Sequence, residues 1–165
     1  MEHELDRVDT KIVSELAKDS SQSSKKLSDK VGVTRQTVAS RILKLQEEGI
    51  ITGFRAKLDY QKLGYNIFFL LFLKLGSFEE GLLRQALEDF RESHHVLMDA
   101  SVTGEWDVMQ ILAFRSTKEY DEYIANLRTK YGKVFRDSKS HAILRIFKSP
   151  EDFVPTFSSS SSRSY

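Results

Sequence analysis

A basic stretch in the N-terminal third of the sequence carries the side-chain types that bind nucleic acid. Residues 20–46 contain six Lys and Arg residues and one acidic residue, in a chain of 165 residues whose formal net charge is +1. Gln can pair bidentately with adenine and Arg with guanine, and hydroxyl groups can bond to phosphates or base edges. Off the apolar stripe of one expected helix lie the candidate DNA-binding residues Thr34, Arg35, Gln36, Thr37, Ser40, Arg41 and Lys44.

Three helices must position this basic face, and the spacing of apolar residues predicts all three. The first ends near Asp19, the second spans residues 25–30 and ends at Gly32, and the third follows Thr34 as its N-cap and stops at Gly49. The expected buried stripe consists of Leu5, Val8, Ile12, Leu16, Leu27, Val31, Val38, Ile42 and Leu45. A helix, a short helix, a glycine turn and a longer helix form the helix-turn-helix pattern, and a generic three-helix bundle is the alternative.

The second half of the sequence changes to a mixed pattern of strands and helices. Strands are expected at residues 65–75, 96–102, 106–114 and 140–147, and helices at residues 78–93 and 117–131. This is the β-α-β-β-α-β order of the ferredoxin-like arrangement, in which both helices cover one face of a four-stranded antiparallel sheet. The predicted fold class is therefore α+β, with an N-terminal helix-turn-helix (winged-helix-like) domain and a C-terminal ferredoxin-like domain.

The pattern divides the chain into four segments. We expect a helix-turn-helix domain over residues 1–53, a hinge strand and linker over 54–64, a ferredoxin-like domain over 65–148 and a flexible tail over 149–165. The extended stretch at residues 50–58 is predicted to be a short strand that opens the hinge. The tail holds both prolines and a run of serines, so its last eight residues are expected to be mobile.

The first strand of the second half is apolar on both faces. Ile67, Phe69, Leu71 and Leu73 occupy one phase of the pleat, and the other phase holds Phe68, Leu70 and Phe72. A half-solvated antiparallel sheet would instead alternate with polar residues, and soluble monomers rarely expose an apolar patch of this kind. We therefore expect a second copy of the sheet to cover it in an isologous homodimer. The alternative cover is the N-terminal half of the same chain.

Patterns typical of catalysis or metal binding do not occur in the sequence. The lack of Cys excludes a disulfide scaffold, thiolate zinc sites and a Cys nucleophile. His94 and His95 are adjacent, so on a helix they would diverge and could not chelate one metal as an i, i+4 pair can. We expect no enzyme activity and no metal. The alternative is a small-molecule-binding or enzymatic ferredoxin-like protein whose helical half is an oligomerisation module.

The sequence contains no stretch typical of membrane insertion. The longest apolar run, residues 67–73, is seven residues long, whereas a membrane-spanning helix needs about 18 or more. The first ten residues are polar and acidic, unlike a secretory signal. We therefore expect a cytoplasmic protein.

Three groups of residues resemble the Lrp/AsnC family of feast/famine transcription regulators. They are Leu5-Asp6-x-x-Asp9-x-x-Ile12-x-x-x-Leu16, then Ser28-x-x-Val31-Gly32-Val33-Thr34, and then Arg41-Ile42-x-x-Leu45-x-x-x-Gly49-Ile50-Ile51. Residues 102–107 are similar to the central hairpin of that family, with Glu105-Trp106 where the family usually carries Asp-Tyr or Asp-Phe. The resemblance covers roughly residues 4–148. It implies DNA-binding dimers, often assembled into octamers, and amino-acid effectors that bind between dimers.

This resemblance points to the hairpin as the effector site, and the side chains there suit an amino acid. Gly104 lets the backbone turn tightly and present N–H groups to the effector carboxylate. Asp107 is the candidate partner for the effector ammonium, and Asp99 is the second choice. The expected effector-binding residues are Asp99, Thr103, Gly104, Glu105, Trp106, Asp107, Ser138 and Ser140. Such an effector is the only small molecule expected, and the alternative is that Gly104 only turns the hairpin and Trp106 only fills the core.

Overall fold

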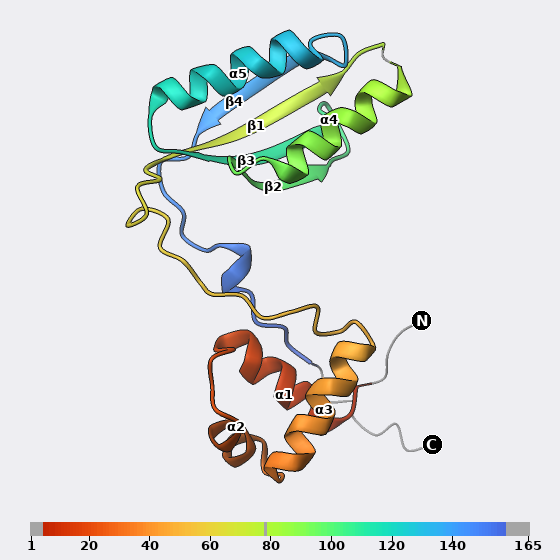
Figure 1. Ribbon diagram of the computed structural model, residues 1–165, viewed down its shortest axis with the longest axis vertical. Coiled ribbons are helices and arrows are strands. Elements are labelled where there is room, and N and C mark those ends of the chain that lie inside the picture. The colour runs from red at the N-terminus through yellow and green to blue at the C-terminus, as the bar shows by residue number, and fades with distance from the viewer. Residues whose placement is uncertain (1–4, 78, 158–165) are drawn as a thin grey trace. The chain divides into compact units, whose positions relative to one another are not determined.

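The computed structural model describes residues 5–77 and 79–157 and divides the chain into two compact units. The helical unit comprises the residues up to Lys57 together with those from Phe147 onward, and the sheet unit spans Leu58–Ile146 (Figure 1). The boundary at Lys57 lies inside the predicted linker, and the described part of the predicted tail groups with the helical unit. Residues 158–165, for which we expect mobility, lie outside the described residues.

Three helices form the core of the helical unit. They are α1 (Arg7–Lys18), α2 (Ser24–Val31) and α3 (Arg35–Glu47), and they confirm the three predicted helices. The predicted stripe supplies the fully buried residues Ile12, Leu27, Val31, Val38 and Leu45, none of which is more than 4 % exposed. Its other members are partly buried and pack against these five: Leu5, Val8, Leu16 and Ile42.

Side-chain caps and one glycine determine where α2 and α3 begin and end. The hydroxyl of Ser23 accepts a hydrogen bond from the N–H of Lys26 at the start of α2. The hydroxyl of Thr34 accepts one from the N–H of Thr37 at the start of α3, at 3.1 Å. Between the two helices Gly32 has a φ of 84°, a left-handed conformation that other residues adopt only at a cost. The short connection of the helix-turn-helix therefore depends on this glycine.

An ionic cluster of three residues, Asp6, Asp9 and Arg41, joins α1 to α3. Nη1 of Arg41 donates to Oδ2 of Asp6 at 2.6 Å and to Oδ2 of Asp9 at 3.1 Å. Asp6 is also the N-cap of α1, and its carboxylate accepts a hydrogen bond from the backbone N–H of Asp9. This hydrogen bond is the main reason why the pKa of Asp6 lies below its ordinary value. Asp9 is only 4 % exposed, so its carboxylate is buried beside the guanidinium.

The sheet unit has the predicted β-α-β-β-α-β order. Its elements are β1 (Ile67–Leu75), α4 (Glu80–Glu92), β2 (Val96–Ser101), β3 (Val108–Phe114), α5 (Thr117–Tyr131) and β4 (Phe135–Ala142). Each strand pairs antiparallel with its neighbours, in the order β2-β3-β1-β4. This order confirms the ferredoxin-like arrangement and makes β1 a central strand and β4 an edge strand.

The two faces of the sheet differ in what covers them. On one face Leu71 and Leu112 pack in the same core as Phe90 of α4 and Leu127 of α5. The opposite face, here called the open face, is formed by the alternate residues of the same strands. Its apolar members are Phe68, Leu70, Phe72, Met98, Ala100, Met109, Ile111 and Ala113. Both phases of β1 are therefore apolar, but only one of them lies under the helices of this unit.

The last strand lies earlier in the chain than the sequence predicts. The predicted strand covers residues 140–147, whereas β4 begins at Phe135 and ends at Ala142. An edge strand with few buried residues tolerates a polar sequence, so β4 lacks the apolar pattern by which strands are recognised. The apolar residues that suggested the later position follow the strand, and Leu144 and Phe147 are 96 % and 88 % exposed.

The strand predicted at residues 50–58 does not form within the described residues. The N–H groups of Ile50 and Ile51 both bond to the carbonyl of Leu45, at 2.9 and 3.0 Å, and so complete the end of α3. After them Phe54 and Leu58 are about half exposed, and no strand of either unit pairs with this stretch in the parts of the chain that are described. A strand needs a ladder partner, and here the segment has none.

The C-terminal segment of the helical unit, residues 147–157, contains a single 3-10 turn, η1 (Pro150–Asp152). Asp152 accepts hydrogen bonds from the N–H and the hydroxyl of Ser149, both at 3.0 Å, and forms an ion pair with Lys57. The Lys57 ammonium and the Ser149 N–H hold the pKa of Asp152 well below its usual range. The segment is thus attached to the chain just before the sheet unit begins.

Replacing the cation of the ionic cluster tests how much the helical unit depends on it. We expect Arg41→Ala to destabilise this unit, because a buried carboxylate left without its partner costs about 1–3 kcal/mol. Arg35→Ala is the matched control, since Arg35 lies exposed on the same helix. Thermal and urea unfolding followed by circular dichroism should separate the two variants. Equal stabilities would contradict the role assigned to the cluster.

Candidate DNA-binding and effector sites

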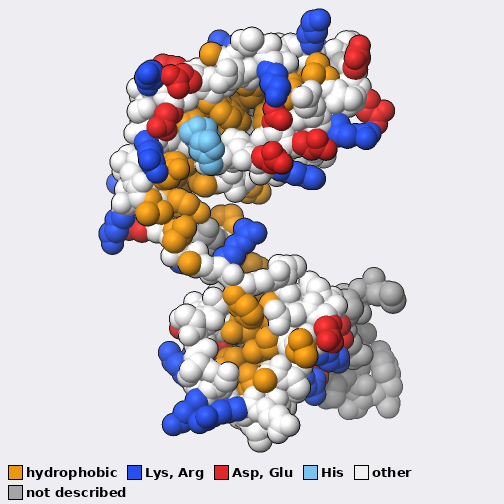
Figure 2. All heavy atoms as spheres, viewed as in Figure 1, with side chains coloured by type: hydrophobic (Ala, Val, Ile, Leu, Met, Phe, Trp, Pro, Cys, Tyr) orange, Lys and Arg blue, Asp and Glu red, His pale blue; other side chains and the backbone are white. Residues whose placement is uncertain are grey.

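The outer face of α3 brings together most of the predicted DNA-binding residues. Arg35, Gln36, Ser40 and Lys44 are exposed, whereas Val38 and Leu45 point into the core from the other side of the helix. In Figure 2, Lys and Arg side chains also gather beside α2 on the lower part of the helical unit. The helix-turn-helix therefore presents exposed basic and amide side chains beside its glycine turn.

These side chains differ in how far they are already engaged. The hydroxyls of Thr34 and Thr37 lie 2.9 Å apart at the helix start, and Ser40 donates to the carbonyl of Thr37 at 3.0 Å. Lys44 lies 3.6 Å from a carboxylate oxygen of Glu48. Over residues 5–77 and 79–157, the Arg35 and Gln36 side chains form neither hydrogen bonds nor ion pairs. Arg35 and Gln36 are therefore the side chains on this face whose full donor and acceptor capacity is available.

Arg41 is the predicted DNA-binding residue that the structure places apart from the rest. Its guanidinium points back to α1, where it forms the ionic cluster with Asp6 and Asp9. The side chain keeps 33 % of its surface exposed, but its charge is balanced within the unit. Asp6, Asp9 and Arg41 all belong to the sequence motif quoted above, and the structure shows that they bind one another inside the helical unit.

The hairpin between β2 and β3 contains the centre of the predicted effector site. Gly104 has a φ of 113°, so the turn uses the conformational freedom for which the glycine was singled out. Thr103, Gly104 and Glu105 are exposed at the tip, and Trp106 lies partly buried with its ring 6.1 Å from that of Phe72. The tip therefore offers accessible backbone N–H groups.

Asp107 is held by the end of β1. Its Oδ2 accepts the backbone N–H of Leu75 at 2.8 Å and lies 3.3 Å from the ammonium of Lys74. The Leu75 N–H is the main cause that lowers the pKa of Asp107, so the carboxylate is charged at neutral pH. The backbone N–H of Asp107 also donates a hydrogen bond to the carbonyl of Leu73. Asp107 thus fixes the hairpin to the central strand.

Asp99 and Ser140 are committed to contacts on the helix-covered face of the sheet. Asp99 accepts a hydrogen bond from the amide of Gln110, which is fully buried and in turn accepts one from the Tyr123 hydroxyl at 2.9 Å. Burial raises the pKa of Asp99. Ser140 shares a 2.7 Å hydrogen bond with the hydroxyl of Tyr120 on α5. The structure therefore does not bring these two side chains together with the hairpin tip.

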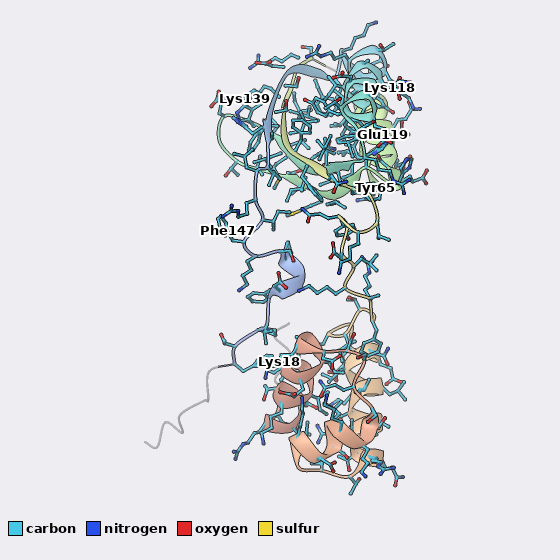
Figure 3. The ribbon with its side chains drawn as sticks, turned by 90° about the vertical axis from the view of Figure 1, so that its left-hand side faces the viewer. Lys18, Tyr65, Lys118, Glu119, Lys139 and Phe147 are labelled. Carbon is cyan, nitrogen blue, oxygen red and sulfur yellow. The ribbon has the colours of Figure 1, made fainter. Side chains whose placement is uncertain are left out.

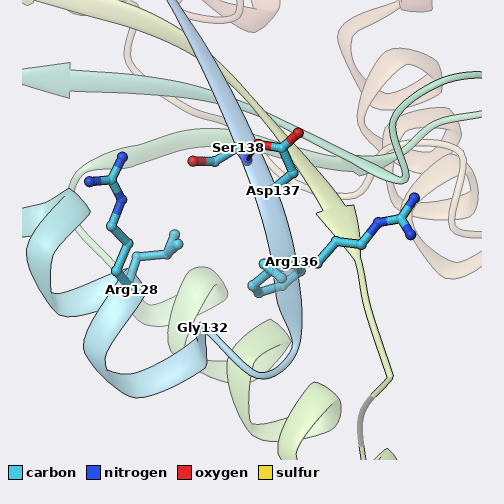
Figure 4. A pocket seen from close by; sticks show the side chains of 7 residues that line it. Arg128, Gly132, Arg136, Asp137 and Ser138 are labelled. Carbon is cyan, nitrogen blue, oxygen red and sulfur yellow. Dashed lines mark hydrogen bonds between the residues drawn. The ribbon is translucent and has the colours of Figure 1, made fainter.

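A hollow of about 360 Å³ lies where α5 ends and β4 begins. Its polar lining is Arg128, Arg136, Asp137 and Ser138 around Gly132 (Figure 4). A Cβ at Gly132 would come within 2.5 Å of the Arg128 carbonyl, so this close turn requires glycine. Of the lining residues only Ser138 was predicted, because the sequence places the last strand too late and hides Arg136 and Asp137.

The hairpin and this hollow lie at the same end of the sheet. Asp107 bonds to Leu73 and Leu75 on one side of β1, and on the other side Ser138 and Phe135 of β4 pair with the same two residues. The end of β1 therefore separates Asp107 from Ser138. Together they form a candidate effector site that combines the exposed hairpin tip with Arg128, Arg136 and Asp137. The two guanidinium groups point to opposite sides of β4 (Figure 4).

A metal site and a membrane-spanning helix would each leave a recognisable arrangement in residues 5–77 and 79–157. Within these ranges, no three His, Asp or Glu side chains come together as they would to hold a metal ion. None of the helices there combines the length and apolar character that crossing a membrane requires.

Comparison with known sequences and structures places this geometry in a family. Residues 5–52 match the family model described as winged helix-turn-helix DNA-binding. An HTH-type transcriptional regulator of Pyrococcus furiosus is 33 % identical over 150 residues, which cover 91 % of this chain and 97 % of that protein. The HTH-type transcriptional regulator LrpA of Bacillus subtilis is 31 % identical over 125 residues, covering 74 % of this chain and 89 % of that one.

A solved structure shares the fold. The crystal structure of a transcriptional regulator of Neisseria meningitidis in complex with L-methionine superposes with a TM-score of 0.82 at 18 % identity, covering 88 % of this chain and 94 % of that chain. The helix-turn-helix, the ferredoxin-like sheet unit and the relatives over nearly the full length lead to one conclusion: the chain is a transcriptional regulator of the Lrp/AsnC family, with a helix-turn-helix DNA-binding domain.

Proposed function

We propose that this regulator binds operator DNA as a homodimer through α3, and that an amino acid bound at the hairpin end of the sheet modulates this binding. The observation that carries the proposal is the outer face of α3. There Arg35 and Gln36 are exposed and free of partners within the described residues, beside a tight glycine turn. These two types are suited to guanine and adenine edges in the major groove.

The inward orientation of Arg41 changes which side chains are assigned to DNA. We assign direct base readout to Arg35 and Gln36, because the guanidinium group of Arg35 and the amide group of Gln36 form no hydrogen bond or ion pair within the described residues. Thr34, Thr37 and Ser40 keep exposed surface beside their capping bonds and suit phosphate contacts at the start of the helix. Lys44 is a further phosphate contact, because its distance of 3.6 Å to Glu48 describes a weak exposed pair.

The open face of the sheet supports the homodimer. It carries the apolar side chains of three neighbouring strands, and α4 and α5 both lie on the other face. A second copy of the same face is a cover of the right shape and chemistry, since an isologous contact pairs each patch with itself. Polar residues of β4, among them Lys139 and His141, border the apolar centre. An apolar centre with a polar border is the usual composition of such an interface.

The chemistry of the hairpin end supports an amino-acid effector. Arg136, whose guanidinium points away from Arg128 (Figure 4), can bind a carboxylate, and Asp137 can accept from an ammonium, as the two charged groups of an amino acid require. The exposed N–H groups around Gly104 provide donors from the other side of β1. Asp107 is assigned to positioning the hairpin, because the Leu75 N–H already occupies it. The L-methionine bound by the regulator from Neisseria meningitidis is in keeping with this class of ligand.

Substitutions on α3 test the DNA-binding assignment. We expect Gln36→Ala to relax sequence preference at one base pair and to cost about 1–3 kcal/mol of binding on a selected operator. We expect the same of Arg35→Ala, whereas Lys44→Ala, which removes a phosphate contact, should weaken all sequences equally and reduce the salt slope by about 1. Binding is measured by fluorescence anisotropy at several salt concentrations, and Lys118→Ala, an exposed charge of the sheet unit, is the control. Unchanged affinity in the Arg35→Ala, Gln36→Ala double variant would refute the assignment.

A charge on the open face tests the dimer. Leu70→Glu places a carboxylate opposite Ile111 on that face, and burying it without a partner in a dimer is costly. We expect wild type to sediment as a dimer or larger and Leu70→Glu to sediment as a folded monomer. Leu63→Glu is the control, because Leu63 is already half exposed and lies before the sheet. A monomeric wild type would show instead that the chain covers its own sheet.

A calorimetric screen of the twenty amino acids tests the effector. We expect at least one to bind wild type, and we expect Arg136→Ala and Asp137→Ala to weaken it by about tenfold or more, because each removes a charge-assisted hydrogen bond. Asp121→Ala, which removes an exposed carboxylate elsewhere, should bind as wild type does. A hit that binds all three variants equally would place the effector elsewhere. No hit at all would remove amino acids as the ligand class and leave DNA binding untouched.

A further inference from the structure

A second hollow, of about 320 Å³, lies in the sheet unit and is lined by Tyr65, His94, His95, Arg115 and Glu119. Tyr65 precedes β1, the two histidines precede β2, and Arg115 follows β3 directly. Because these strands are antiparallel, all three positions fall at the end of the sheet opposite the hairpin. In Figure 3, Tyr65 and Glu119 lie on the same side of the unit. The hollow is therefore distinct from the proposed effector site.

Arg115 provides the permanent positive charge of this hollow. Its guanidinium carbon lies 4.9 Å from the centre of the Tyr65 ring. This cation–π contact orients the guanidinium group without using its hydrogen-bond donors. Glu119 accepts the backbone N–H of Arg115 at 2.9 Å, so this carboxylate is bound to the main chain of Arg115 and does not pair with the guanidinium. Within the described ranges the guanidinium has no carboxylate partner. Its donors are free to bind a ligand.

Two histidines lie beside Arg115 in the same hollow. The His95 ring stacks on Phe114 with centroids 4.7 Å apart, and its Nδ1 lies 3.2 Å from the carbonyl of Ala113. This contact suits a ring that carries a proton on Nδ1, and it fixes the ring orientation. The His94 ring lies 4.4 Å from that of His95 and is exposed. Figure 2 shows exposed histidine side chains on the sheet unit with basic and acidic side chains around them.

We propose that this hollow binds a small ligand through an oxyanion group, a phosphate or a carboxylate. Arg115 presents a planar fork of N–H donors to such a group, and the exposed imidazole of His94 provides a further donor in the same hollow. Glu119 is the acidic residue of the hollow. Its carboxylate accepts the backbone N–H of Arg115 and does not pair with the Arg115 guanidinium. A concave site of this size matches a small molecule, whereas a DNA backbone would require an extended basic surface.

The histidines themselves report on this site. The imidazole C–H resonances of His94 and His95 are followed by NMR while inorganic phosphate or acetate replaces chloride at constant ionic strength. We expect saturable shifts at both residues and none at His141, which lies on β4 outside this hollow. Arg115→Gln should weaken the saturation by about tenfold or more because the charged fork is lost. Lys118→Gln, which removes a charge on the neighbouring first turn of α5, should leave it unchanged.

The outcomes separate the ligand classes. Tighter saturation by phosphate identifies a phosphorylated ligand, and tighter saturation by acetate identifies a carboxylate. Shifts that grow linearly, that include His141, or that persist in Arg115→Gln would overturn the proposal. A response to duplex DNA but to neither anion would also overturn it, since the residues would then belong to the DNA-binding surface. Circular dichroism of each variant confirms that the fold is retained.

Discussion

The central strand β1 is apolar on both faces, and the sheet unit is organised around this strand. Its odd-numbered residues, among them Leu71 and Leu73, form the core with α4 and α5, while Phe68, Leu70 and Phe72 make the centre of the open face. Its C-terminal end is held by Asp107 and lies between the hairpin and the hollow at β4. Its N-terminal end follows Tyr65 and the second hollow. One strand therefore supplies the core, the proposed interface and the position of both candidate ligand sites.

In the helical unit the charged residues divide into two groups with different tasks. Asp6, Asp9 and Arg41 form an internal cluster that joins α1 to α3. Arg35 and Gln36 lie on the outer face of α3, without internal partners in the described residues. The internal cluster fixes the helix, so that the outer side chains are presented from a rigid element. Such rigidity is what precise recognition of base edges requires.

The sequence predicts most of this fold because the helices and central strands carry strong periodic signals. The cap at Thr34, the helix end at Gly32 and the β-α-β-β-α-β order are all confirmed. The errors fall where tertiary pairing, rather than local pattern, decides the structure. The polar edge strand β4 forms because β1 lies beside it. The apolar stretch at residues 50–58 forms no strand, because no other strand in the described part of the chain lies alongside it.

The candidate sites were harder to predict, because residue type and spacing do not reveal which partner a charged group chooses. The sequence predicts that Arg41 contacts DNA and that Asp107 contacts the effector. In the structure each of them binds a partner inside the fold that is distant in sequence. Each hollow is lined by residues from different parts of the fold, such as Arg128 of α5 with Arg136 of β4, and His95 before β2 with Arg115 after β3. Such combinations become visible only once the strand register is known.

The ion pair between Lys57 and Asp152 has a consequence for the order of folding. The two residues are 95 positions apart and enclose the whole sheet unit. Closing an unfolded loop of this length costs far more conformational entropy than an exposed ion pair returns. The pair therefore forms only after the sheet unit has folded and has itself shortened the loop. The C-terminal segment is therefore the last part of the helical unit to take its place.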